Sequence, residues 1–139
     1  MDYSALAAYS DWIKPVVYHG CAGPRMKNRF VTTLSGGLLR EFPAPEVVQA
    51  LYSILGYDRV KEPGYDELAK RGHTPDYVYR ETKRCVDGVG GKCGVYPGVG
   101  FDIPGQAAPS DPKVVYEATH QAFRAGGHGL IISREYDEM

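Results

Sequence analysis

The chain has 139 residues, of which 43% are hydrophobic and 24% charged, with a formal net charge of −1. This length suits one domain, residues 1–139, with a modest core. The near-neutral balance argues against nucleic-acid binding, and no apolar run approaches the roughly 20 residues of a membrane span. No basic segment followed by an apolar run marks a signal peptide at the N-terminus, so we expect a cytoplasmic location.

Cysteine and tyrosine usage gives two further expectations. Cys21, Cys85 and Cys93 are an odd number without close spacing, which argues against a disulfide framework and suits a reducing compartment. Tyrosine occurs 11 times. An aromatic ring with a polar tip suits a carbohydrate, which presents both an apolar face and hydroxyls. Tyrosine is also a common partly buried core residue, and this second reading stays open.

The first half of the chain predicts one strand and several helices. Residues 1–10 suit a short helix, and residues 13–18 suit a buried strand that Pro15 delays or confines to an edge. Residues 18–26 form a Gly- and Pro-rich segment that we expect to be a loop. Residues 28–42 are compatible with a helix weakened by two adjacent glycines, and residues 45–55 have clear helical periodicity with Gly56 as the cap.

The second half carries clearer signals for where helices and strands begin and end. Residues 65–71 suit one or two helical turns ended by Gly72. Thr74 and the proline that follows it open a helix that runs to Gly88, with Cys85 on its inner stripe. A Gly-rich turn leads into a strand over residues 93–101. A helix over residues 111–125 and a strand over residues 129–133 then complete a strand–helix–strand unit.

Strands alternating with helices predict a parallel α/β sheet. Three parallel strands do not close a barrel and leave two open edges, which proteins pair or cover. We therefore expect part of a (β/α)8 barrel, a half TIM barrel, that associates with a second copy to pair those edges. The alternative is that residues 19–92 contain further strands.

Three segments carry a resemblance. Residues 11–26 (DWIKPVVYHGCAGPRM), 95–104 (VYPGVGFDIP) and 130–139 (LIISREYDEM) resemble the last strands of glycoside-hydrolase-like (β/α)8-barrel proteins of bacteria. The resemblance covers nearly the whole chain but only the C-terminal half or less of such a barrel. It implies a sugar-processing site at the carboxyl ends of the strands. The early strands, which in many barrel glycosidases hold the general acid, have no counterpart here.

Two carboxylates follow strands that we expect to be neighbours. Asp102 and Glu135 each lie just beyond a parallel strand. Neighbouring strands of a sheet are about 4.8 Å apart, so the two carboxylates can come close together. Glycosidases place two carboxyl groups about 5 Å apart for retention or about 6.5–9.5 Å apart for inversion, and the sequence leaves that choice open. We expect Glu135 as acid/base and Asp102 as nucleophile or water activator, and the reverse assignment stays open. The residues expected to hold the sugar are His19, Arg25, Tyr18, Tyr96, Arg134 and Tyr136.

Other interpretations compete with the glycosidase hypothesis. Asp102 could cap a turn, and Glu135 could form an ion pair. A metal site from His19, Cys21 and the two carboxylates lacks a supporting ligand motif, and a Cys21 nucleophile has weaker support still. We therefore predict neither metal nor cofactor. The competing class is a non-catalytic half-barrel that binds a sugar or serves as a self-associating scaffold.

Overall fold

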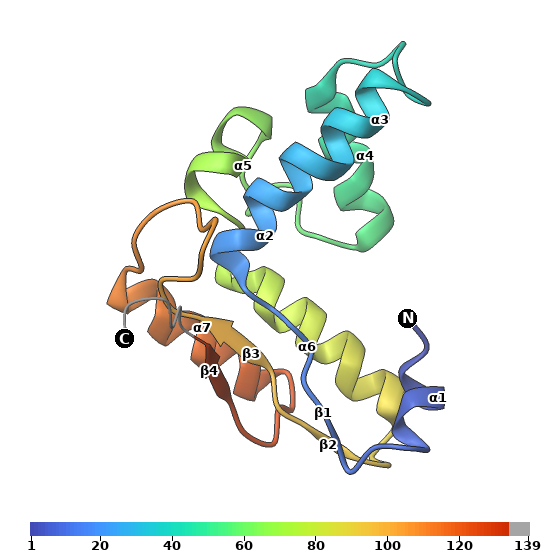
Figure 1. Ribbon diagram of the computed structural model, residues 1–139, viewed down its shortest axis with the longest axis vertical. Coiled ribbons are helices and arrows are strands. Elements are labelled where there is room, and N and C mark those ends of the chain that lie inside the picture. The colour runs from blue at the N-terminus through green and yellow to red at the C-terminus, as the bar shows by residue number, and fades with distance from the viewer. Residues whose placement is uncertain (134–139) are drawn as a thin grey trace.

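A computed structural model describes residues 1–133 of the chain. It has two parts, a small parallel sheet flanked by helices and a lobe of helices that projects from one end of that sheet (Figure 1). The lobe is built by residues 19–71, between the first and second strands, and the rest of the described chain builds the sheet and its covering helices. The chain therefore leaves the sheet after the first strand, builds the lobe, and returns to the sheet.

The sheet consists of short parallel pairings around one central segment, residues 94–100. β1 (Trp12–Ile13) pairs with β2 (Gly94–Val95), and β3 (Gly98–Gly100) pairs with β4 (Ile131–Ser133), both in parallel. A parallel bridge from Val16 to Gly98 extends the first pairing toward the second. The three predicted strands are therefore present and parallel, although each is shorter than the sequence suggested.

Two long helices cover one face of the sheet. α6 (Pro75–Val89) and α7 (Pro112–Arg124) pack against each other and against β2 and β3. This arrangement follows from their sequences, because both begin with proline after a residue suited to the N-cap, and both carry a small or β-branched inner stripe. The resulting core contains Val17, Val78, Val99, Ala118 and Ala122.

A second core closes the amino end of the sheet. α1 (Tyr3–Ala7) begins at Asp2, whose carboxylate accepts a hydrogen bond from the backbone nitrogen of Ala5. Ala7 packs with Cys85 of α6 and with Val95 of β2. The predicted N-terminal helix and the predicted inward position of Cys85 are both confirmed.

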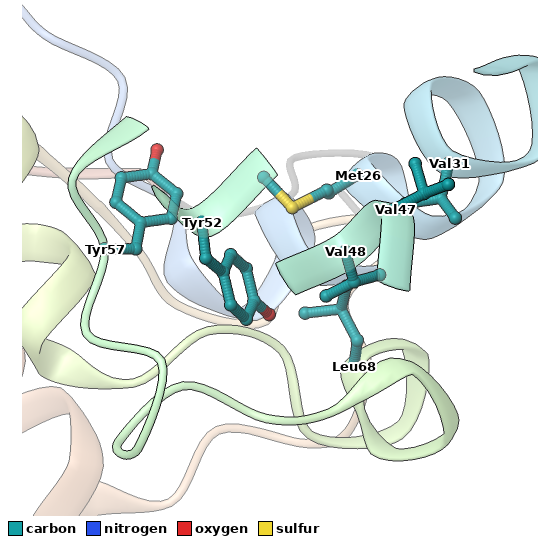
Figure 2. Packing of buried hydrophobic residues seen from close by; sticks show 7 residues of the cluster. All are labelled: Met26, Val31, Val47, Val48, Tyr52, Tyr57 and Leu68. Atoms are coloured by element: carbon teal, nitrogen blue, oxygen red, sulfur yellow. The ribbon is translucent and has the colours of Figure 1, made fainter. Parts of the chain in front are cut away.

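The helical lobe has a core of its own. α2 (His19–Arg25), a π-helical segment η1 (Met26–Val31) and α3 (Thr32–Gly36) follow one another without a break and form a rod (Figure 1). α4 (Ala44–Leu55) and α5 (Tyr65–Arg71) pack beside that rod. Figure 2 shows the side chains that fill the space between them: Met26, Val31, Val47, Val48, Tyr52, Tyr57 and Leu68.

The prediction that residues 18–26 form a loop is wrong, because His19–Arg25 is a helix. Pro24 has no N–H, so it cannot donate to the carbonyl of Gly20 one turn earlier. The backbone nitrogen of Ala107 donates to that carbonyl instead, at 3.0 Å. A hydrogen bond from a distant loop thus replaces the missing helical bond, and the local sequence carries no sign of it.

The described architecture is α/β in a general sense. Residues 19–92 form helices and turns without a strand, so the alternative of hidden strands in that segment is wrong. The strands β1 to β4 form two two-stranded parallel pairings, and no barrel closes within residues 1–133. In the same range, no helix combines the length and apolar character of a membrane span.

Gly23 marks the closest approach between the rod and α5. A Cβ at this position would lie 2.6 Å from the carbonyl oxygen of Leu68 and 2.7 Å from the Cα of Gly72. We expect Gly23→Ala to lower the free energy of unfolding by about 1–3 kcal/mol, because the backbone atoms of Leu68 and Gly72 that face the new Cβ cannot shift easily. Gly36→Ala is the control, since a Cβ there meets nothing within 4 Å. Urea denaturation should show it unchanged or stabilised by up to about 1 kcal/mol, and equal effects of the two variants would contradict the argument.

Candidate functional site

Three polar side chains meet at the carboxyl ends of the outer strands. Lys14 Nζ donates to Ser133 Oγ at 2.9 Å and to the Tyr18 hydroxyl at 3.1 Å, and the Tyr18 hydroxyl donates to Ser133 Oγ at 2.7 Å. Each side chain bonds to the other two, so we call the group the Lys14–Tyr18–Ser133 cluster. The first two residues come from the segment that begins with β1, and the third comes from β4. The cluster therefore bridges the central segment of the sheet.

The central segment lets the cluster form because it has no side chains in the way. A Cβ on Gly98 would lie 2.5 Å from Lys14 Cε, and a Cβ on Gly100 would lie 3.3 Å from Tyr18 Cβ. Lys14 and Tyr18 thus lie directly over these two glycines. Any larger residue would displace the side chains that reach Ser133.

The cluster changes the acidity of the Tyr18 phenol. Partial burial acts to raise the pKa, but the hydrogen bonds with Ser133 and Lys14 and the positive charge of Lys14 act in the opposite direction. The net result is a Tyr18 pKa below its usual value of 10.0. A phenol of this kind ionises more readily and can take part in proton transfer nearer to neutral pH.

A cavity of about 280 Å³, lined by both polar and apolar side chains, lies beyond the carboxyl end of β3. Gly100 forms part of its wall, and the beginnings of α6 and α7 form much of the rest. Its polar lining contains both hydrogen-bond donors and acceptors, from His19, Lys70, Arg71, Thr74, Gln106, Ser110 and Asp111. The volume is near the lower limit of about 300–1,000 Å³ for ligand pockets, so the cavity suits a small polar molecule.

A buried carboxylate–histidine pair supports the wall of this cavity. Glu62 and His73 have fully buried side chains, and Glu62 Oε2 lies 2.9 Å from His73 Nδ1. The same carboxylate accepts hydrogen bonds from the backbone nitrogen of Thr74 at 3.0 Å and from its hydroxyl at 2.8 Å. Thr74 is the N-cap residue of α6 as the sequence predicted, but its hydroxyl is bonded to Glu62 and does not cap the helix.

His19 is the first residue of α2, and its side chain is buried. The residue is only 7% exposed and its Nδ1 has no hydrogen-bond partner among the described residues. Burial lowers the pKa of His19, the nearby His73 lowers it further, and Glu62 opposes the shift. The imidazole therefore stays neutral at pH 7 and can exchange hydrogen bonds with an uncharged ligand in the cavity.

Asp102 lies in the loop that closes the other side of the cavity. Its carboxylate accepts a hydrogen bond from the backbone nitrogen of Ser110 at 2.9 Å, and its own backbone nitrogen donates to Ser110 Oγ at 2.9 Å. Its φ of 46° lies in the left-handed region, where Asp is tolerated better than most residues. The carboxylate is exposed, and it also stabilises the loop as the turn-capping alternative predicted.

The other predicted residues do not converge on one site. Tyr18 and Arg25 line a second, more apolar cavity of about 440 Å³ between the rod, α4 and α6, whereas His19 lines the first. Tyr96 lies near the amino end of the sheet, where its ring packs edge-on against Trp12 with centroids 6.0 Å apart. The predictions for Arg134, Glu135 and Tyr136 lie outside the described residues.

The hypotheses of a Cys21 nucleophile and of a metal site gain no support from the geometry. Burial raises the pKa of the Cys21 thiol although Arg25 opposes the shift, which disfavours the thiolate that a nucleophile needs. All three cysteines are free and buried. Within residues 1–133, no group of three or more His, Cys, Asp or Glu side chains is arranged to hold a metal ion.

Sequence reasoning missed Lys14, Glu62 and His73. Lys14 and Tyr18 are four residues apart in an extended segment, which puts them on one face, and this spacing was a usable signal. Glu62 and His73 are separated by a helix, and nothing in the sequence indicates that they touch.

Comparison with protein-family models, with curated proteins and with solved structures finds no match to this chain.

The Glu62–His73 pair should be a major source of stability. We expect Glu62→Gln to lower the free energy of unfolding by about 1–3 kcal/mol, because the buried amide keeps only one acceptor oxygen where the carboxylate uses two, and it loses the negative charge beside His73. Glu67→Gln is the matched control, since Glu67 forms an exposed ion pair with Lys70 and should cost less than about 1 kcal/mol. Chemical denaturation of both variants measures the difference. A Glu62 variant no less stable than the control would contradict the interpretation.

Proposed function

We propose that this chain binds a carbohydrate at the carboxyl ends of its parallel strands and hydrolyses a glycosidic bond there, as part of a half-barrel. The observation that carries the proposal is the cavity of about 280 Å³ beyond β3, whose lining combines apolar surface with hydrogen-bonding side chains. Ligands of α/β folds bind at this edge of a parallel sheet. The mixed donors and acceptors of the cavity suit the hydroxyls of one sugar ring.

The catalytic part of the proposal rests on two carboxylates, Asp102 after β3 and Glu135 after β4 in the sequence. One oxygen of Asp102 is held by the backbone of Ser110, and the side chain stays exposed beside the cavity loop. Glu135 follows β4 by two positions in the sequence, and β4 pairs directly with β3. In this mechanism Glu135 protonates the leaving oxygen, and Asp102 attacks the sugar or activates water.

Substitution of either carboxylate should separate turnover from binding. We expect Glu135→Gln and Asp102→Asn to reduce hydrolysis of aryl glycosides by about 10²-fold or more while sugar binding persists. Asn can still accept the hydrogen bond from Ser110, so the loop keeps its conformation. Asp66→Asn, an exposed carboxylate on α5, is the control. Unchanged hydrolysis in the Glu135 variant would remove Glu135 from the mechanism.

Binding can be tested without turnover. Ala108 is an exposed residue at the wall of the cavity, so Ala108→Trp should block entry and abolish sugar-induced NMR shifts. Ala8→Trp adds the same ring at an exposed position outside that wall and should leave them unchanged. If no sugar from a broad panel shifts the resonances of His19 or Ser110, the carbohydrate proposal fails.

Self-association is the second candidate function, and the outer strands favour it. Within residues 1–133, β1 and β4 each pair with another strand on one side only. Val16 and Ile132, beside these edges, are 54% and 61% exposed. Paired edges in a second copy would cover apolar side chains and satisfy backbone groups together.

The solution mass tests this candidate directly. We expect a dimer by light scattering on a sizing column, and we expect Ile132→Lys to shift it to monomer because an edge lysine opposes strand pairing. Val60→Lys, at a position that is 93% exposed, should leave the dimer intact. A monomer at all concentrations of the unmodified chain would contradict pairing of the sheet edges.

A further inference from the structure

The Lys14–Tyr18–Ser133 cluster has no role in the proposed carbohydrate site. None of its three residues lines the cavity beyond β3, which is walled by His19, Gly100 and the loop before α7. The three side chains are half-buried and lie over Gly98 and Gly100. A hydroxyl held between a cation and a phenol is an unusual arrangement, because each neighbour changes what that hydroxyl can do.

We propose that Ser133 is the nucleophile of an ester-hydrolysing site, with Tyr18 as its general base and Lys14 as the cation that stabilises negative charge. Ser133 Oγ lies 2.7 Å from the Tyr18 hydroxyl, which is within the range for direct proton transfer. Lys14 Nζ lies 2.9 Å from the same oxygen. The three groups thus have the roles of nucleophile, base and electrostatic stabiliser in one contact network.

The lowered pKa of Tyr18 supports the assignment of the base. When the phenol ionises, the direction of the 2.7 Å contact reverses and Ser133 donates its proton to the phenolate. Lys14, at 3.1 Å from the same phenolic oxygen, stabilises the ionised form. The pair therefore supplies a base that a serine hydroxyl alone lacks.

The reaction balances with water as the only co-reactant. Ser133 Oγ forms a bond to the ester carbonyl carbon while its proton passes to the Tyr18 phenolate, and the oxyanion develops beside the Lys14 ammonium. The intermediate collapses as the bond to the alcohol breaks, and the departing alcohol takes the proton from Tyr18. Water then attacks the acyl-serine, with Tyr18 accepting its proton and returning it to Ser133. One ester and one water become one acid and one alcohol.

Within residues 1–133, exposed side chains lie on the face of the sheet that carries the cluster, which gives a substrate access to this serine. α6 and α7 cover the opposite face, and on the open side Trp12 and Val16 are 53% and 54% exposed. The glycines under the cluster add no bulk there. A small ester therefore reaches the cluster without entering the carbohydrate cavity, and the two proposals stand or fall separately.

A fluorophosphonate probe tests the proposal on the full chain, because it forms a stable bond with an activated serine. We expect one adduct per chain by intact mass, located on Ser133 by peptide mapping, together with a burst of nitrophenol from p-nitrophenyl acetate. Ser133→Ala should abolish both signals. Tyr18→Phe and Lys14→Met should slow adduct formation by about 10²-fold or more, since they remove the base and the cation.

Matched variants separate activation from folding and from general serine reactivity. Tyr18→Phe keeps the ring and its packing, so circular dichroism and thermal unfolding should match the unmodified chain. Ser53→Ala removes an exposed serine of α4 and should change neither signal. The proposal is overturned if no adduct forms, if the adduct lies on another residue, or if Tyr18→Phe reacts at the original rate. In each of those cases the cluster only joins the outer strands.

Discussion

The buried carboxylate of Glu62 is the interaction on which the arrangement of the two parts depends. It binds His73 and both the backbone and hydroxyl of Thr74, so one side chain joins the loop after α4 to the beginning of α6. A buried charge is costly unless it is fully bonded, and here each oxygen has a partner. The backbone of His73 also donates to the carbonyl of His19 at 2.9 Å, so the same junction fixes the start of α2. The lobe, the sheet and the cavity wall therefore share one anchor.

The junction also needs backbones in close contact. Gly23 approaches Gly72 so closely that neither accepts a Cβ, and a Cβ on Gly72 would lie 2.7 Å from the carbonyl oxygen of His19. Because Pro24 cannot donate to the Gly20 carbonyl, that carbonyl accepts a hydrogen bond from the backbone nitrogen of Ala107, and this bond ties the cavity loop to α2. Residues that look like loop formers in the sequence thus serve a helix that packs tightly. Here the small size of the glycines and the missing N–H of the proline matter more than any conformational freedom.

Local signals were sufficient for most of the helices and strands, and insufficient for the contacts between them. α4 with its glycine cap, α5 before Gly72, α6 after Thr74 and α7 after Asp111 all follow from capping residues and periodicity. α2 did not, because its stability comes from Ala107 and from backbone contacts with α5. The same limit applies to the site. Tyr18 and His19 were identified from their place after a strand, but the sequence could not show that they face different cavities.

The glycines of the central segment leave room for the Lys14–Tyr18–Ser133 cluster beside the cavity on one small sheet. On the covered face, Val95 and Val99 are buried against the helices and hold the strands in register. On the open face, Gly98 and Gly100 leave room for side chains from β4 and from the segment after β1 to meet above them. A side chain at either glycine would keep Lys14 and Tyr18 away from Ser133 and leave the core unchanged. The central segment thus places valines toward the helices and only glycines beneath the cluster, and this difference favours a functional role for that part of the open face.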